Sequence, residues 1–157
     1  MPSSHDSVLY LMPAPVVVVG AAAAGVTGGL TAAWVSRVSL DPPMVAVSVA
    51  PERFTHGLLD ESGLFTISVL RPDQVEEGRL FGLESRRDVD KWSRVDHVLL
   101  EGGTPALKSC AARMACRTVA RHVAGDHEIF VGEILGSELV DGGPGLVMKG
   151  SDWAPRK

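Results

Sequence analysis

The sequence predicts a mainly β fold: an antiparallel barrel of six or seven short strands, with a few short helices covering its ends. Short apolar runs, several of them rich in β-branched residues, recur along the chain and are separated by turn signals that contain Gly or Pro. A parallel sheet would require strands that alternate with long helices, and this alternation is absent. The 157 residues have the length of one domain, and no internal repeat divides them.

Composition excludes several classes of protein. The net charge of -4 argues against a nucleic-acid-binding protein, which would carry a basic patch. The uncharged residues 16–35 are rich in Gly, Ala and Thr, so they would insert poorly into a membrane, and we interpret them as two strands. The first basic residue is Arg37, which is too late for a secretory signal. We therefore expect a cytoplasmic protein with no membrane partner.

The two cysteines, Cys110 and Cys116, are too few for a disulfide framework or a zinc site. We expect both to be small buried side chains on one face of a strand, in a reducing compartment. No motif of metal ligands is present, and we predict no metal site.

The expected elements follow the chain in order. Residues 1–12 form an N-terminal arm or a leading strand, residues 13–150 form the domain, and residues 151–157 form a tail. The expected strands and helices are listed by residue number: strands at 16–22, 44–49, 65–70, 129–135 and 146–148, and helices at 51–59 and 72–81. Residues 111–123 fit a helix or a strand equally, because Arg113, Arg117 and Arg121 share one face in either case. The turn at Gly125 and Asp126 favours a hairpin.

Residues 28–43 differ from an ordinary core strand. They alternate small residues with hydroxyl-bearing residues, where a core strand would alternate large apolar with polar residues. Small side chains let a flat ligand or another backbone come close, and the hydroxyls offer hydrogen bonds. Pro42 and Pro43 cannot donate to a sheet ladder, so we expect this single strand to stop or reach a sheet edge there.

This stretch resembles a known family. Thr31-Ala32-Ala33-Trp34, Ser36, Ser39 and residues 40–45 look like the core motif of the flavin reductase-like, FMN-binding split-barrel family, in its flavoredoxin-type branch. Residues 53–55, 65–70, 90–92 and 125–127 extend the resemblance from about Pro13 to about Leu139. The resemblance implies a split β-barrel, and it decides in favour of a strand at residues 111–123.

The resemblance also implies a site for FMN or FAD. Carried over residue by residue, the cofactor-binding residues are Thr31, Ala32, Ala33, Trp34, Ser36, Ser39, Thr55, Lys91 and His127. His127 is the implied catalytic residue, because a histidine near the flavin can donate a hydrogen bond to the reduced ring or orient the nicotinamide.

Arg53 and Arg86 are candidate phosphate donors by position, since a helix N-terminus beside Arg53 offers free N–H groups to an anion. The site residues also have plainer interpretations: core packing for Trp34, a helix-cap or first-turn hydroxyl for Thr55, a surface lysine for Lys91 and a turn residue for His127. Ser36 and Ser39 would then bond a strand neighbour, and Arg53 and Arg86 would form surface ion pairs. Gly28 stands where several flavoredoxin-like proteins have an amide side chain, so a weaker hold on FMN is expected.

The leading hypothesis is an NAD(P)H-dependent flavin oxidoreductase that passes a hydride from nicotinamide to flavin N5 and electrons to an acceptor, for example a monooxygenase. The resemblance implies a homodimer with the cofactor near the subunit interface. One alternative is a non-enzymatic FMN-binding electron carrier on the same barrel. A purely structural β-barrel partner protein is the third.

Overall fold

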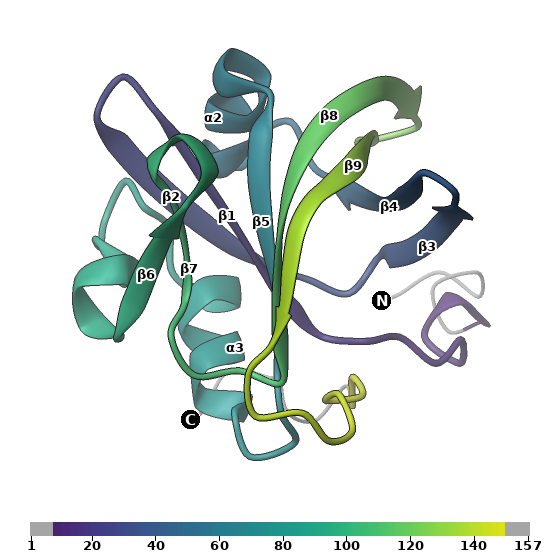
Figure 1. Ribbon diagram of the computed structural model, residues 1–157, viewed down its shortest axis with the longest axis vertical. Coiled ribbons are helices and arrows are strands. Elements are labelled where there is room, and N and C mark those ends of the chain that lie inside the picture. The colour runs from purple at the N-terminus through teal and green to yellow at the C-terminus, as the bar shows by residue number, and fades with distance from the viewer. Residues whose placement is uncertain (1–7, 150–157) are drawn as a thin grey trace.

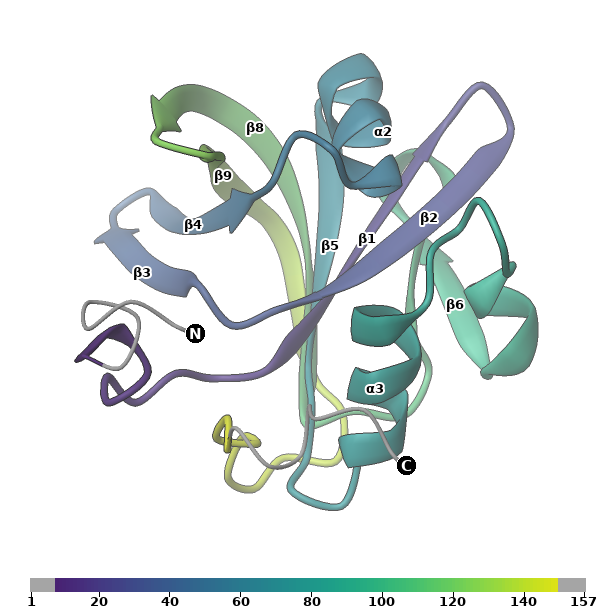
Figure 2. The same ribbon diagram turned by 180° about the vertical axis from the view of Figure 1, so that it is seen from behind.

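The computed structural model describes residues 8–149. Its strands are β1 (Val17–Ala23), β2 (Val26–Ala32), β3 (Val35–Leu40), β4 (Pro43–Val49), β5 (Leu64–Val69), β6 (His97–Leu100), β7 (Thr104–Leu107), β8 (Ala112–Ala124) and β9 (His127–Leu139). Its helices are α2 (Phe54–Ser62), α3 (Val75–Leu83) and two short 3-10 helices, η1 (Lys91–Arg94) and η2 (Glu101–Gly103). Figures 1 and 2 show their arrangement from opposite sides.

Seven strands form one antiparallel sheet in the order β2-β1-β5-β8-β9-β4-β3. The strands β2 and β3 are its two edges, yet only Ala33 and Trp34 separate them in sequence. A connection of two residues cannot span an open sheet of seven strands that lie about 4.8 Å apart. The sheet therefore curls until its edges meet, which confirms the predicted antiparallel barrel.

The prediction of a single strand at residues 28–43 is wrong. The chain leaves one edge of the sheet at Ala32 and enters the other at Val35, so the stretch is two strands, β2 and β3. Between them the Trp34 carbonyl accepts a hydrogen bond from the Ser48 amide at 3.0 Å, which joins the connection to β4. The predicted stop before the double proline is confirmed, because β3 ends at Leu40.

Strand β1 is buried on both faces, which explains its uninterrupted valines. Val17 and Val19 belong to a cluster inside the barrel, together with Phe65, Ile67 and Phe130. The alternating Val16 and Val18 belong to a second cluster outside it, with Phe81, Trp92 and Leu107. Side chains of successive strand residues point to opposite faces, so β1 contributes to both clusters at once.

Helix α2 packs on β1 and β2, and α3 packs on β2 (Figure 2). Both begin three residues later than predicted. Pro51 and Pro72 lie inside tight turns, closed by hydrogen bonds from the Arg53 amide to the Ala50 carbonyl and from the Gln74 amide to the Arg71 carbonyl. A proline in the second position of a turn has the φ angle that the turn needs, so both prolines belong to the turns and not to the helices.

Hairpin β8–β9 resolves the ambiguity at residues 111–123 in favour of a strand. The three arginines with a spacing of four each form an ion pair with a glutamate of β9: Arg113 with Glu138, Arg117 with Glu133 and Arg121 with Glu128. Arg113 and Arg117 share one face of β8, as predicted. The prediction is wrong for Arg121, because a β-bulge between Thr118 and Ala120 turns it to the opposite face, across from the buried Phe130.

Other expectations are only partly met. The small sheet of β6 and β7 was not predicted, because its strands have four residues each and one contains a proline. Residues 146–148 make an isolated bridge, between Pro15 and Val147, and no strand. Residues 8–12 form a helical turn, so they are an arm and not a leading strand. Residues 1–7 and the expected tail lie outside the described residues.

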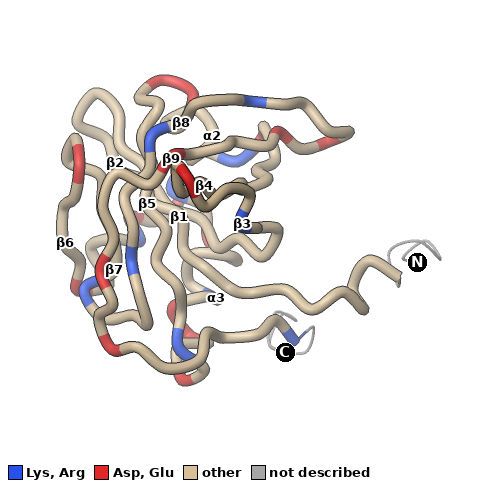
Figure 3. The backbone as a smooth tube through the Cα atoms, turned by 45° about the vertical axis from the view of Figure 1, so that its right-hand side comes forward, with Lys and Arg blue, Asp and Glu red and all other residues tan. Residues whose placement is uncertain are grey.

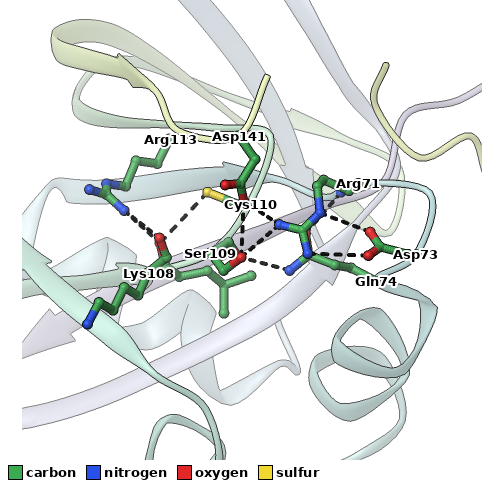
Figure 4. Close-up of polar contacts among 9 residues, drawn as sticks. Arg71, Asp73, Gln74, Lys108, Ser109, Cys110, Arg113 and Asp141 are labelled. Atoms are coloured by element: carbon green, nitrogen blue, oxygen red, sulfur yellow. Dashed lines mark hydrogen bonds and ion pairs between the residues drawn. The ribbon is translucent and has the colours of Figure 1, made fainter. Parts of the chain in front are cut away.

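Arg71 anchors the segment that follows β9 (Figure 4). Its guanidinium donates to Asp73 at 2.9 Å, to Ser109 at 2.7 Å and to Asp141. The Ser109 hydroxyl also donates to Asp141 at 3.0 Å. These contacts join the turn before α3, the start of β8 and the C-terminal segment on one side of the barrel.

Both cysteines are buried free thiols, as expected, but they do not share a face. Cys116 lies in β8 and points into the barrel cluster, and Cys110 precedes β8 and lies in the outer cluster. Burial raises the pKa of the Cys116 thiol to about 12, and it raises the pKa of Cys110 as well. Neither thiol is therefore poised to react near neutral pH.

Candidate functional site

A cavity of about 340 Å³, which we call the split pocket, opens where the two edges of the sheet meet. The lining comes from the end of β2 and the β2–β3 connection, the β4–α2 segment, the start of β9 and the two terminal segments. Its residues are Tyr10, Leu30, Thr31, Ala32, Ala33, Trp34, Ser48, Val49, Ala50, Glu52, Arg53, His127 and Met148. Its volume lies within the range of small-molecule sites. The edges of the barrel thus provide a slot, and the slim side chains of Ala32 and Ala33 form one wall.

Trp34 and His127 stand together at this wall. The Trp34 side chain is 51% exposed, and its ring centroid lies 4.6 Å from that of His127. The His127 Nδ1 lies 2.8 Å from an Asp126 carboxylate oxygen, which leaves Nε2 as the ring nitrogen free for a ligand. The exposure of Trp34 is incompatible with the plainer interpretation of core packing. An exposed indole beside an imidazole can stack on a flat ring and offer it a hydrogen bond.

Two cations meet at the end of α3, and one of them, Arg53, lines the pocket. Arg53 Nη2 donates to the Phe81 carbonyl at 3.3 Å, and Lys91 Nζ donates to the carbonyls of Phe81 at 3.1 Å and Glu84 at 2.7 Å. These carbonyls end α3, so both side chains supply hydrogen bonds that the helix end lacks, where its dipole favours positive charge.

Each cation has an acidic residue nearby: the Glu52 charge acts on Arg53, and the Glu84 charge acts on Lys91. Burial lowers the pKa of Arg53. Burial, with the nearby Arg53 charge as a second cause, lowers the pKa of Lys91 to about 8. Two neighbouring positive charges, the half-buried Arg53 and the buried Lys91, make this part of the pocket suited to an anion such as a phosphate.

The structure brings six of the predicted residues to the split pocket: Thr31, Ala32, Ala33, Trp34, Arg53 and His127. The Thr31 hydroxyl donates to the Gly78 carbonyl of α3 at 2.7 Å, so its proton is directed away from the cavity. Thr55 lies in the first turn of α2, in agreement with its plainer interpretation, whereas that of Lys91 is wrong. Lys91 is 1% exposed, so it is no surface lysine, and it acts on the pocket from behind, beside Arg53.

The remaining predicted residues lie elsewhere. Thr55 is buried in α2, and Ser39 lies at a bulge in β3. Ser36 donates to the Arg37 carbonyl at 3.1 Å and lines a neighbouring groove. Arg86 donates to the Thr27 carbonyl at 3.0 Å, which anchors the loop before η1 on β2.

Gly28 faces the protein interior and does not line the pocket. A Cβ placed on it would come within 2.8 Å of Leu58 Cδ1 and 3.1 Å of Thr55 Oγ1. Packing against α2 therefore requires a residue without a side chain here. Position 28 does not line the split pocket, so having glycine there in place of an amide side chain takes no group away from the pocket lining.

Sequence reasoning missed several lining residues, chiefly Tyr10, Ser48, Glu52 and Met148. Glu52 could have been found from its place beside Arg53, between a strand and a helix. Tyr10 and Met148 carry no local signal, because they reach the pocket only through the course of the two chain ends.

A second and more apolar hollow of about 580 Å³, which we call the arm groove, adjoins the split pocket. Leu9 and Met12 of the N-terminal segment form one side, and Ala33 and Trp34 are shared with the split pocket. Figure 3 shows this uncharged N-terminal segment extending away from the barrel. Tyr10 and Leu11 are exposed beside it, at 72% and 82%.

Replacing Lys91 with methionine should change how stability depends on pH. The pKa of lysine is 10.5 without the fold, and that of Lys91 in the folded protein is about 8. Between these values the unfolded chain holds a proton that the folded protein has released, so the wild type's free energy of unfolding rises with pH. The difference of about 2.5 corresponds to about 3 kcal/mol. In Lys91→Met the free energy of unfolding should not show this rise. Urea unfolding at a series of pH values measures it.

Lys108→Met is a matched control, because it removes the same positive charge from an exposed position. Lys108→Met should keep the wild-type rise. If the free energy of unfolding of Lys91→Met rose with pH as steeply as that of the wild type, Lys91 would not be a buried cation with a lowered pKa.

None of the helices within residues 8–149 has the length and hydropathy to cross a membrane. The same residues contain no group of three or more His, Cys, Asp or Glu side chains placed to share a metal ion.

The chain is similar to known proteins in sequence and in structure. A family model described as a flavin reductase-like domain matches residues 9–153. SmoA, an FMN reductase (NADH) of Agrobacterium fabrum, is 37% identical over 116 residues, which are 74% of this chain and 64% of SmoA. The chain spans between 52% and 72% of the length of SmoA and of two archaeal relatives.

Two solved structures are similar throughout the barrel. BorF, the flavin reductase component of a bacterial two-component tryptophan halogenase, has a TM-score of 0.82 and 32% identity, and covers 92% of this chain and 91% of its own. Flavoredoxin from Methanosarcina acetivorans has a TM-score of 0.77 and 31% identity, and covers 82% of this chain and 70% of its own.

Proposed function

The chain belongs to the flavin reductase-like family, and we propose from this that it is an NAD(P)H-dependent flavin oxidoreductase using FMN or FAD. It would pass a hydride from nicotinamide to flavin N5 and electrons on to an acceptor. The split pocket is the observation that carries the proposal. It combines a wall of small side chains, an exposed indole beside a partly exposed imidazole, and the Arg53 cation in one slot.

The residues present fit a flavin. We assign the isoalloxazine ring to the wall of Ala32, Ala33 and Trp34, because only small side chains leave room for a flat ring there. We assign the phosphate to Arg53, with Lys91 contributing charge from behind. Backbone amides of the β2–β3 connection complete the set of donors. Bound flavin would supply the hydride acceptor, and the protein supplies binding, orientation and electrostatics.

His127 is the proposed catalytic residue. Asp126 holds its Nδ1 at 2.8 Å, so the ring orientation is set and Nε2 is free to contact the flavin edge or the nicotinamide. A donor at the edge of the ring stabilises the negative charge that develops on reduction. We propose only an indirect role in flavin binding for Ser36, Ser39 and Thr55, since they lie outside the split pocket.

The decisive test is NADH and NADPH oxidation by the purified protein with FMN or FAD, followed by flavin bleaching in a stopped-flow instrument. Flavin-dependent oxidation of at least one nucleotide is expected. If neither nucleotide is oxidised with either flavin, the protein is no reductase.

Trp34→Ala and His127→Ala should separate binding from chemistry. Loss of one aromatic contact should weaken flavin binding roughly 2- to 10-fold in Trp34→Ala. Loss of the edge donor should slow nucleotide oxidation by about 100-fold in His127→Ala. Flavin titration and steady-state kinetics measure the two effects. His122→Ala, on the exposed part of β8, serves as the control and should match the wild type.

A second candidate is an electron carrier that holds FMN and receives electrons from a protein donor. The similarity to a flavoredoxin favours it. Tight FMN without nucleotide oxidation would support the carrier, and the purified protein would then be yellow. A colourless protein that oxidises NADH when flavin is added would support a reductase with diffusible flavin.

We also propose a homodimer in the cytoplasm, with a flavin-consuming partner such as a monooxygenase or halogenase component. The exposed apolar arm and the arm groove support a second copy of the chain beside the split pocket. The two free thiols suit a reducing compartment. Light scattering on a size-exclusion column measures the dimer, and a monomeric mass would contradict it.

A further inference from the structure

The tip of hairpin β8–β9 carries His127, whose ring contacts Trp34, and it extends beyond the strand that supports the rest of the hairpin. Strand β4 pairs with β9 only as far as Glu128, opposite Val49. Glu128 lies opposite Val123 of β8, so beyond that point residues 124–126 are exposed and the backbone pairing is between β8 and β9 alone. Figure 1 shows this end of the hairpin curving over beside β4. The position of His127 therefore depends on whatever fixes the tip to the body.

Four polar side chains make that connection, and none of them lines the split pocket. Arg121 of β8 donates to both oxygens of Glu128, from Nε at 3.1 Å and from Nη2 at 2.7 Å. Its third nitrogen, Nη1, donates to Asp60 of α2. Glu128 Oε1 also lies 2.7 Å from His56 Nε2 of α2. A two-pronged guanidinium–carboxylate contact holds one geometry, unlike a single exposed ion pair.

This cluster rests on the core. Phe130 is completely buried, and the Arg121 guanidinium lies 4.8 Å from its ring centroid. The His56 ring meets the same phenyl ring edge-on at 5.4 Å. The side chains of His56 and Glu128 are only 14% and 15% exposed. Helix α2 also carries Arg53 at its N-terminus, so the cluster links the two sides of the split pocket.

We propose that His56, Asp60, Arg121 and Glu128 form a clamp that positions His127 against Trp34 for hydride transfer. These are positioning residues, because they act through the hairpin tip and contact no ligand. The claim about the clamp rests on the structure of the tip alone. The claim about hydride transfer rests on the proposed function.

Arg121→Met tests the clamp, and Arg117→Met is its matched control. Both arginines lie on β8 and pair with a glutamate of β9. The β-bulge between Thr118 and Ala120 puts them on opposite faces, so Arg117 forms its ion pair with Glu133 on the outer face and makes no hydrogen bond or ion pair with α2 among the described residues. Hydrogen exchange of residues 124–127 should become about tenfold faster in Arg121→Met and stay at the wild-type rate in Arg117→Met. Glu128→Gln, which keeps the shape of the side chain, should show an intermediate rate.

Kinetics complete the test. In Arg121→Met we expect kcat to fall about tenfold, because His127 leaves its position, while the flavin Kd stays within about twofold, because Arg53 is untouched. Equal exchange rates at the tip in the two variants would overturn the clamp. A loosened tip with wild-type kcat, or parallel losses of kcat and flavin affinity, would overturn the positioning of His127. A wild-type protein without reductase activity would refute the proposed function, and hydrogen exchange would still decide the clamp.

Discussion

Arg53→Met is expected to weaken FMN binding by roughly 10- to 100-fold. Arg53 is the cation that lines the split pocket, and a hydrogen bond to a charged group contributes about 1.5–3 kcal/mol. The fold should tolerate the change, because Lys91 still donates to the Phe81 carbonyl at 3.1 Å and a neighbouring positive charge is removed. Fluorescence titration with FMN measures the effect.

Riboflavin gives this prediction its internal control, since it has the same ring without the phosphate. Its affinity should change less than about threefold, because the variant removes only a phosphate contact. Arg94→Met, in the exposed part of η1, should leave both affinities at their wild-type values. Equal losses of FMN and riboflavin affinity in Arg53→Met would place the phosphate away from Arg53.

Gly20→Ala is expected to have the largest effect on stability. A Cβ at position 20 would lie 2.0 Å from the Pro105 carbonyl oxygen and 2.5 Å from Thr66 Oγ1, which itself donates to that carbonyl. The obstacle is backbone, so β7 would have to move off the barrel. Overpacking of this kind costs about 3 kcal/mol. For a chain of this length that corresponds to a fall in Tm of roughly 6–12 °C, which calorimetry measures.

Gly57→Ala is the matched control with the opposite sign. Gly57 is an exposed residue within α2, and a Cβ there meets nothing within 4 Å. Alanine is a better helix former than glycine, so stability should rise by about 0.5–1 kcal/mol. If Gly20→Ala unfolded within about 2 °C of the wild type, the close approach of β7 to β1 would be wrong.

Local patterns in the sequence were sufficient for much of the fold. The valine run of β1, the two helices with their apolar faces and the hairpin turn at Gly125 and Asp126 each follow from residues close together in the chain. The helix starts were placed too early because a proline suits both a turn and a first helical residue, and sequence does not distinguish them. Strands β6 and β7 are too short to show a period.

The motif around Trp34 identified the family and the wall of the site, because the need for slim side chains is written in the residues themselves. Sequence could not show that β2 and β3 are opposite edges of one sheet. Nor could it show that Lys91 is buried behind Arg53, because burial there depends on the end of α3, ten residues away in the chain.

By itself, therefore, the sequence determined the mainly β fold, the order of its principal elements and the family, since these depend on short-range patterns. Only the tertiary structure decided where the site opens, which residues line it and what holds His127 in place. Barrel closure brings residues 10, 34, 53, 127 and 148 to one cavity. Contacts between such distant parts of a chain depend on how the whole sheet curls, and no local spacing records that.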